Sequence, residues 1–431
     1  MKRVFLLSAV AMLAACSVHA QDISGDWQGT LKAGPKQLRL ILNMVHDHEG
    51  NWKATLFSID QQPDGVPVDS VAIQDSTLKF AVSAVRGSYE GKISADRNSI
   101  TGKWTQGLSL PLDFERATKE TAWPRDPSPH TVHFISVDKD VKLEVLDWGG
   151  SGRPVVLLTG LGNNAHIFDK FAPKLIGNYH VYAITRRGFG ASSAPVPDSK
   201  NYSADRLGDD VLAVCDALKL NRPVLIGHSI AGEELSSVGS RYAEKVAGLI
   251  YLDAAYSYAY YDRSRGDLLI DSLDVERKLR LLRPGSGQRD QKRLIQELLE
   301  ADLPQVEKDL REEQEDVKVM PAAMATAQSA TISPAGQAIL AGEQKYANIP
   351  VPILAIYAVP HDIGQFLASD ASSRLAFEHR DQITTGAQAT ALETGIPSAH
   401  VVRLPHASHF VFFSNEADVL REIDAFLSKV P

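Results

Sequence analysis

The chain has 431 residues, of which 44% are hydrophobic and 23% charged, a composition typical of globular proteins. Acidic residues outnumber basic ones by 53 to 45, which gives a formal net charge of −8. Because a protein that binds nucleic acid usually carries a basic face, this balance argues against that class. The length exceeds that of an ordinary single domain and predicts two domains.

The first twenty residues have the pattern of a signal peptide. Lys2 and Arg3 precede a short apolar run over residues 4–15. The pattern predicts an exported bacterial protein. No later stretch reaches the roughly 18 uninterrupted apolar residues that a membrane span requires.

Two ways of processing this leader stay open. Small residues ending at Ala20 fit a cleavage site, which predicts a periplasmic or secreted protein that begins at Gln21. Residues 13–16 resemble a bacterial lipobox, in which Cys16 would carry a lipid and anchor the protein to the outer membrane.

Residues 22–118 predict a small antiparallel β-barrel or sandwich, because short and partly alternating apolar runs are separated by Gly, Asp and Asn. Three similar segments each place an aromatic residue shortly after a glycine. We expect these aromatics, Trp27, Tyr89 and Trp104, to lie in the core of the domain. The domain loosely resembles the lipocalin-like β domains that precede some bacterial hydrolases.

Residues 119–129 predict a proline-rich linker, since three prolines in seven residues favour an extended spacer. From residue 130 to 431, short apolar runs alternate with helical patterns, which predicts an α/β fold with a mostly parallel sheet covered by helices. The alternation stops over about 256–347, where charged amphipathic patterns predict a helical cap.

The strongest motif surrounds Ser229. An apolar β run ends at Gly227 and His228, and a helical pattern begins directly after the serine. This is the G-x-S-x-G nucleophile elbow, a sharp turn that exposes one serine above a sheet. Here Ala231 replaces the last glycine of the pattern, and Gly232 follows it.

Asp362, after a late strand, and His409, near the C-terminus, follow Ser229 in the chain order of the α/β-hydrolase superfamily. Together these motifs resemble the capped, serine esterase-like branch of that superfamily over residues 130–431. The resemblance implies a catalytic triad of Ser229, Asp362 and His409. Asp253 is the alternative acid, since some members take it from the preceding strand, and His406 is the alternative base.

The resemblance also implies an oxyanion hole, formed by the backbone N–H groups of Leu161 and Ile230. Thr159 stands where the family often has His, and Thr185 replaces an Asp in the family's turn over residues 185–192. We interpret that turn as structural.

These residues predict hydrolysis of a small-molecule carboxylic ester through an acyl-enzyme intermediate. Amidase, lactonase or acyltransferase activity with the same triad, or a non-catalytic binding role, stays open. Dehalogenases and epoxide hydrolases of this fold use Asp as nucleophile, so Ser229 argues against them. We expect no metal or organic cofactor, because zinc and dinucleotide motifs are missing from the sequence. The substrate and the oligomeric state are left open.

Overall fold

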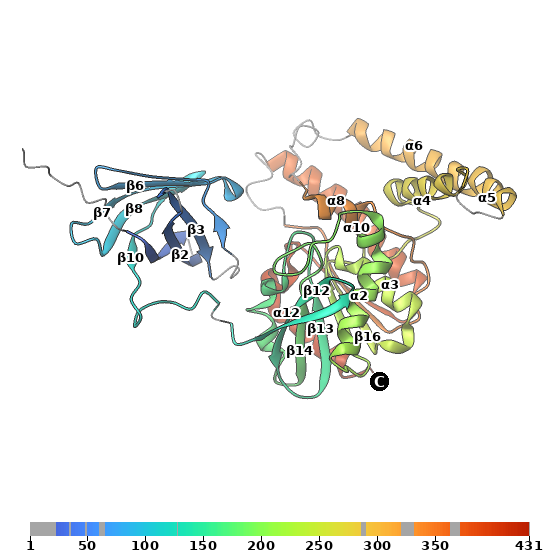
Figure 1. Ribbon diagram of the computed structural model, residues 1–431. Coiled ribbons are helices and arrows are strands. Elements are labelled where there is room, and N and C mark those ends of the chain that lie inside the picture. The colour runs from blue at the N-terminus through green and yellow to red at the C-terminus, as the bar shows by residue number, and fades with distance from the viewer. Residues whose placement is uncertain are drawn as a thin grey trace, which may run out of the picture. The chain divides into compact units, whose positions relative to one another are not determined.

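A computed structural model describes residues 23–33, 36–47, 50–59, 65–126, 128–285, 290–319, 332–362 and 371–430. The signal peptide, both processing sites and Cys16 lie outside these residues. The chain forms two compact units, Met1–Pro127 and Ser128–Pro431 (Figure 1). No helix among the described residues is long and apolar enough to cross a membrane.

The first unit is an antiparallel sheet with the strand order β4-β3-β2-β1-β10-β8-β7-β6-β5, and β9 pairs with β8. Trp27, Tyr89 and Trp104 are almost fully buried, which confirms that these aromatics form the core. In β7 the buried and exposed residues alternate strictly, as expected for a strand with one face on a core. Strands β3 and β5 contact each other, so the curved sheet brings its two edges together.

The bounds of these strands are β1 (Gly25–Ala33), β2 (Lys36–His46), β3 (Trp52–Ser58), β4 (Val66–Pro67), β5 (Ser70–Gln74), β6 (Thr77–Val82), β7 (Gly87–Ile93), β8 (Ser99–Gln106), β9 (Leu108–Pro111) and β10 (Phe114–Arg116).

The second unit contains a mixed sheet with the strand order β11-β12-β14-β13-β15-β16-β17-β18. Strand β12 is antiparallel to both of its neighbours, and the pairs from β14 through β18 are parallel. The sheet is therefore mostly parallel, as predicted. Its strands are β11 (Thr131–Asp138), β12 (Val141–Gly149), β13 (Arg153–Leu158), β14 (Tyr179–Ile184), β15 (Val224–His228), β16 (Gly248–Leu252), β17 (Ile353–Ala358) and β18 (Ala399–Leu404).

The central strands β15, β16 and β17 are buried throughout because helices cover both faces of the sheet. One hydrophobic core joins the sheet to α2, α3 and α10, and a second joins it to η2, η3, α11 and α12. The bounds of these and the remaining helices outside the insertion are α1 (Ser199–Tyr202), α2 (Ala204–Ala217), α3 (Ala231–Arg241), α10 (Ala371–Gly395), α11 (Val411–Ser414), α12 (Glu416–Leu427), η1 (Ser83–Val85), η2 (Ala165–Phe168), η3 (Ala172–Lys174) and η4 (Ala243–Lys245).

A helical insertion separates β16 from β17, in the region where a cap is predicted. It contains α4 (Leu268–Leu281), α5 (Gln291–Glu297), the π-helix η5 (Leu298–Asp302), α6 (Leu303–Val319) and α8 (Pro334–Leu340), labelled in Figure 1 except for η5. Ala338 and Ile339 of α8 pack in one small apolar cluster with Ile230, and Leu161 packs against that cluster. This part of the insertion therefore contacts both predicted oxyanion-hole residues.

The strand order fixes where a site can form. Strand β13 has β14 on one side and β15 on the other, so the chain leaves β13 in one direction and later returns on the opposite side. In open α/β sheets, the crevice at such a reversal, beyond the carboxyl ends of the strands, is where ligands bind. Residues 159–162 follow β13 there, and Ser229 follows β15.

Candidate active site

Ser229 adopts the strained backbone of a nucleophile elbow, with φ of +55°. The turn is tight on both sides. A Cβ on Gly227 would lie 2.9 Å from the Leu235 side chain, and a Cβ on Gly232 would lie 1.9 Å from the carbonyl oxygen of Ala254. The close approach thus falls at Gly232, one position later than in the usual motif, which explains why Ala231 is tolerated.

His409 is hydrogen-bonded to Asp253. Its Nδ1 lies 2.7 Å from Oδ2 of Asp253, which is fully buried at the end of β16. The other carboxylate oxygen accepts the backbone N–H of Ala358 at 2.9 Å. Burial alone would raise the pKa of the Asp253 carboxyl, but hydrogen bonds from His361 and His409 outweigh it and keep the pKa below its usual value.

This pairing favours Asp253, the alternative acid of the sequence analysis, over Asp362, which that analysis preferred. Asp362 is exposed four residues beyond the end of β17, and its backbone N–H donates to the carbonyl of Ala407. Asp253 directly follows the central strand β16, so the carboxyl end of this strand holds its carboxylate against His409. His406, the alternative base, is exposed, and its backbone N–H donates to the carbonyl of Pro360.

His228, the residue before Ser229, links the elbow to His409. Its Nε2 donates a 3.0 Å hydrogen bond to the carbonyl of His409, and the two rings lie 4.7 Å apart between centroids. Burial and the nearby His409 lower the pKa of His228 to about 3, so its ring stays neutral. Sequence reasoning missed this residue, although it occupies the variable position of the elbow motif.

The segment after β13 presses against the elbow. A Cβ on Gly160 would lie 2.8 Å from Nδ1 of His228 and 3.2 Å from Cβ of Ser229. Buried Arg186 fixes this segment, because its guanidinium donates to the carbonyl of Thr159 at 2.7 Å and pairs with Glu234 on α3. Arg186 thereby joins the segment after β13 to α3.

A second histidine, which the sequence analysis also missed, contacts the same acid. Nε2 of His361 lies 2.7 Å from Oδ2 of Asp253, and its Nδ1 lies 2.9 Å from Oδ2 of Asp381 on α10. The only signal in the sequence is its position beside Asp362, in the loop where the resemblance implied the acid.

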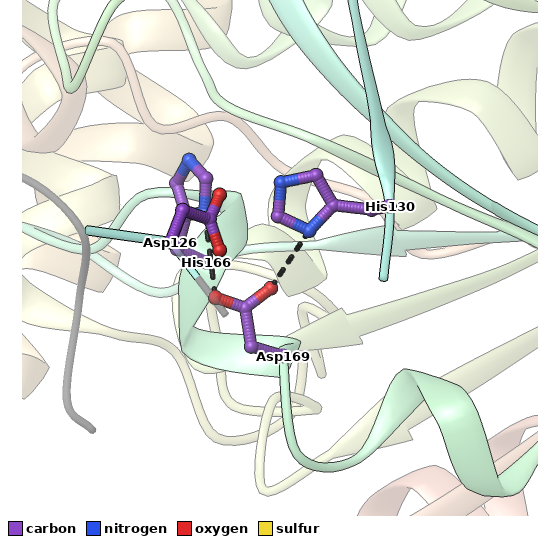
Figure 2. Close-up of side chains that lie close together, drawn as sticks. All are labelled: Asp126, His130, His166 and Asp169. Carbon is purple, nitrogen blue, oxygen red and sulfur yellow. Dashed lines mark ion pairs between the residues drawn. The ribbon is translucent and has the colours of Figure 1, made fainter. Parts of the chain in front are cut away.

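Another cluster of histidines and acids supports η2, which follows the loop after β13. Figure 2 shows Asp169 between His130 and His166, at 3.1 and 3.4 Å from their Nδ1 atoms. Glu144 faces Nε2 of His166 at 3.5 Å. Burial lowers the pKa of His166, but the hydrogen bonds to Asp169 and Glu144 outweigh it and raise the pKa to about 9. The ring is therefore held as a cation.

Thr185, which replaces the aspartate of the family's turn, also helps to hold η2 in place. Its hydroxyl donates to Glu144 at 2.6 Å and accepts the backbone N–H of Ala165, the first residue of η2, at 2.9 Å. Metal ions in proteins also use imidazole and carboxylate ligands, and both this cluster and the one around Asp253 contain such groups. Independence from metal therefore stays a prediction.

Among curated proteins, a fluoroacetate dehalogenase from a Burkholderia species is 33% identical over 116 residues, covering 26% of this chain and 38% of that protein. A serine hydrolase-like protein from Danio rerio is 36% identical over 107 residues, 25% of this chain and 32% of that protein. The matches thus span well under half the length of either relative.

Solved structures also resemble the chain. A hydrolase from Pseudomonas aeruginosa aligns with a TM-score of 0.44 and 20% identity, covering 69% of this chain and 98% of that one. A thermophilic esterase from Thermogutta terrifontis aligns with a TM-score of 0.42 and 19% identity, again over 69% and 98%.

The family assignment rests on a longer match. Residues 155–422, more than half of the chain, match the family described as "Alpha/beta hydrolase family". The matched region includes the elbow, the segment after β13 and the His409 loop. This chain belongs to the alpha/beta hydrolase family.

Proposed function

We propose that this protein is a serine hydrolase that cleaves carboxylic esters through an acyl-enzyme intermediate. The observation that carries the proposal is the hydrogen bond between His409 and buried Asp253, beside an elbow that holds Ser229 at positive φ. In this proposal Ser229 is the nucleophile, His409 the general base and Asp253 the acid that orients it.

In the first step, His409 takes the proton of the Ser229 hydroxyl while the serine oxygen attacks the ester carbonyl carbon. Because Nδ1–H of His409 donates to Asp253, Nε2 is the nitrogen left to act as the base. The carboxylate then stabilises the imidazolium that forms.

The attack places a negative charge on the former carbonyl oxygen. We assign its stabilisation to the backbone N–H groups of Leu161 and Ile230, two residues whose side chains belong to or pack against the apolar cluster that contains Ala338 and Ile339 of α8. The tetrahedral intermediate collapses, and the alcohol leaves with the proton from His409. A water molecule then attacks the acyl-serine with His409 again as base, and the acid and Ser229 are released.

The relatives include a dehalogenase, so the choice of reaction rests on the nucleophile. A serine occupies the elbow, and a serine alkoxide attacks an acyl carbon to give an ester that water can hydrolyse. This supports acyl chemistry at Ser229, and the ester panel below tests the choice of an ester over an amide or lactone.

An active-serine phosphonate probe and a panel of esters of graded acyl length test the proposal. The protein should be labelled once and hydrolyse at least one ester, and Ser229→Ala should lose both properties. Ser240→Ala, on the same α3 helix, is the matched control and should retain them. Labelling that survives in Ser229→Ala would overturn the assignment.

We also propose that the protein is exported, as the basic and apolar pattern of residues 1–20 indicates. Mass spectrometry of the mature protein after cell fractionation distinguishes the two processing routes. A start at Gln21 supports simple cleavage, and an N-terminal lipid on Cys16 supports an anchored lipoprotein. An intact leader on a cytoplasmic protein would contradict both.

A further inference from the structure

One oxygen of the proposed triad acid has two imidazole partners. Oδ2 of Asp253 lies 2.7 Å from Nδ1 of His409 and also 2.7 Å from Nε2 of His361. The remaining oxygen already accepts the backbone N–H of Ala358. His361 therefore competes with His409 for the negative charge of the same oxygen.

His361 is fixed from its other side by Asp381. Oδ2 of Asp381 accepts both from Nδ1 of His361, at 2.9 Å, and from its backbone N–H, at 2.6 Å. The other oxygen of Asp381 accepts the hydroxyl of Thr385 one helical turn later. Both ring nitrogens of His361 thus face carboxylates, an arrangement that requires a proton on each nitrogen.

The surroundings of His361 agree with a charged ring. Burial lowers the pKa of His361, but the hydrogen bonds to Asp253 and Asp381 outweigh it and raise the pKa to about 10. The same contacts keep the pKa of Asp381 below its usual value against the opposing effect of burial. From the loop after β16, the Tyr256 hydroxyl lies 3.2 Å from Nε2, and from the C-terminal loop the His409 ring lies 6.2 Å away.

We propose that His361 is a positioning residue that shares the charge of Asp253 with His409 and so sets the acid side of the enzyme's pH range. This inference rests on the proposed function. A fixed cation beside Asp253 cancels part of the negative potential that draws a proton onto His409. We therefore expect kcat/KM to be maintained in more acidic solution than an unshared carboxylate would allow.

The test is the pH dependence of kcat/KM for His361→Gln. Glutamine keeps an N–H that can donate to Asp253 but carries no charge, so it separates charge from hydrogen bonding. We expect the acidic limb of this profile, the pH range in which kcat/KM falls as the solution becomes more acidic, to move up by about one pH unit. At about pH 9, kcat should stay within about threefold of the wild type.

Asp381→Asn provides a second variant that leaves both residues in contact with Asp253 in place. It removes the carboxylate behind His361 and should move the acidic limb in the same direction by a smaller amount. His379→Gln is the matched control, since His379 is exposed on the same helix, α10. It should leave the profile unchanged.

A uniform loss of activity at every pH in both variants, with the acidic limb unmoved, would overturn the inference and give His361 a purely structural role. An unmoved limb with full activity would overturn it as well. Failure of the proposed function would be recognised separately, because the wild-type protein would then resist the phosphonate probe and hydrolyse no ester.

Discussion

The two units bury different kinds of side chain. Among the described residues, the buried side chains of the first unit are all apolar, with Trp27, Tyr89 and Phe114 at the centre of one core. The second unit has the same kind of apolar cores, but it also buries many polar and charged groups, from Glu144 to Gln388. The candidate active site lies among them.

Burying a charge costs stability unless a partner compensates for it. In the second unit, Arg187 is fully buried and bound through two nitrogens to Asp210, at 2.6 and 2.7 Å. Arg186 and Glu234 join the segment after β13 to α3. Among the described residues, the first unit thus buries apolar side chains alone, whereas the second also buries charged groups that are held in place by their partners.

Of the variants that test this comparison, Asp253→Asn in the second unit should have the largest effect on activity. Losing the carboxylate removes both the orientation of His409 and the stabilisation of its cation, so kcat should fall roughly ten-thousandfold. Asp362→Asn is the control and should stay within about tenfold of the wild type. Steady-state turnover of a small ester measures both, and the opposite ranking would return the acid to Asp362.

Trp27→Ala tests the first unit and should lower its stability without changing the activity of the second. Removing this buried ring from the apolar core should lower the free energy of unfolding of the first unit by about 3–5 kcal/mol. Turnover of a small ester should be unchanged below the melting point of that unit. Calorimetry and activity assays on the same samples measure both. A parallel loss of turnover would show that the stability of the first unit controls the chemistry of the second.

Glu343→Gln tests the cost of buried charge in the second unit. Burial, and to a lesser extent Asp267, raises the pKa of Glu343 from an ordinary 4.5 to about 8. Between these values the folded state binds more protons than the unfolded state, so the free energy of unfolding falls as the pH rises. The variant should raise Tm by about 5 °C at pH 9 and change it little at pH 5. An equal shift at both pH values would contradict this account.

Deleting residues 22–118 should have the smallest effect, because every proposed catalytic residue lies in the second unit. We expect the shortened protein to remain folded and to hydrolyse a small ester within about threefold of the full chain. Melting and turnover should be measured together. A folded protein without turnover would mean that the first unit helps to build the active site.

Local patterns in the sequence predicted the two kinds of fold, the aromatic core and the elbow at Ser229, because short-range periodicity and turn chemistry determine them. The choice between the two candidate acids could not be made in the same way. Asp253 and Asp362 both follow predicted strands, and only the three-dimensional register decides which carboxylate meets His409. The backbone N–H of Ala358, which holds Asp253, comes from a strand about a hundred residues later.

The roles of His228 and His361 were unpredictable for a related reason. No local sequence pattern predicts the hydrogen-bond partners of a histidine. Both residues find their partners in distant segments, His228 in the C-terminal loop and His361 directly after β16 and on α10. The length of α10 also escaped the sequence analysis. The buried polar network of the second unit is therefore the part that sequence reasoning describes least well.

The contact at Gly232 has a consequence for protein engineering. The first turn of α3 is pressed against the carbonyl of Ala254, one residue after the proposed acid. Any side chain there would push apart the segments that carry Ser229 and Asp253. A library randomised at this position and selected for turnover should return only glycine, while the neighbouring Ala231 position should accept both alanine and glycine. Directed evolution of substrate range should therefore leave the elbow untouched and vary Ala338 and Ile339 of α8, which lie in one cluster with Ile230.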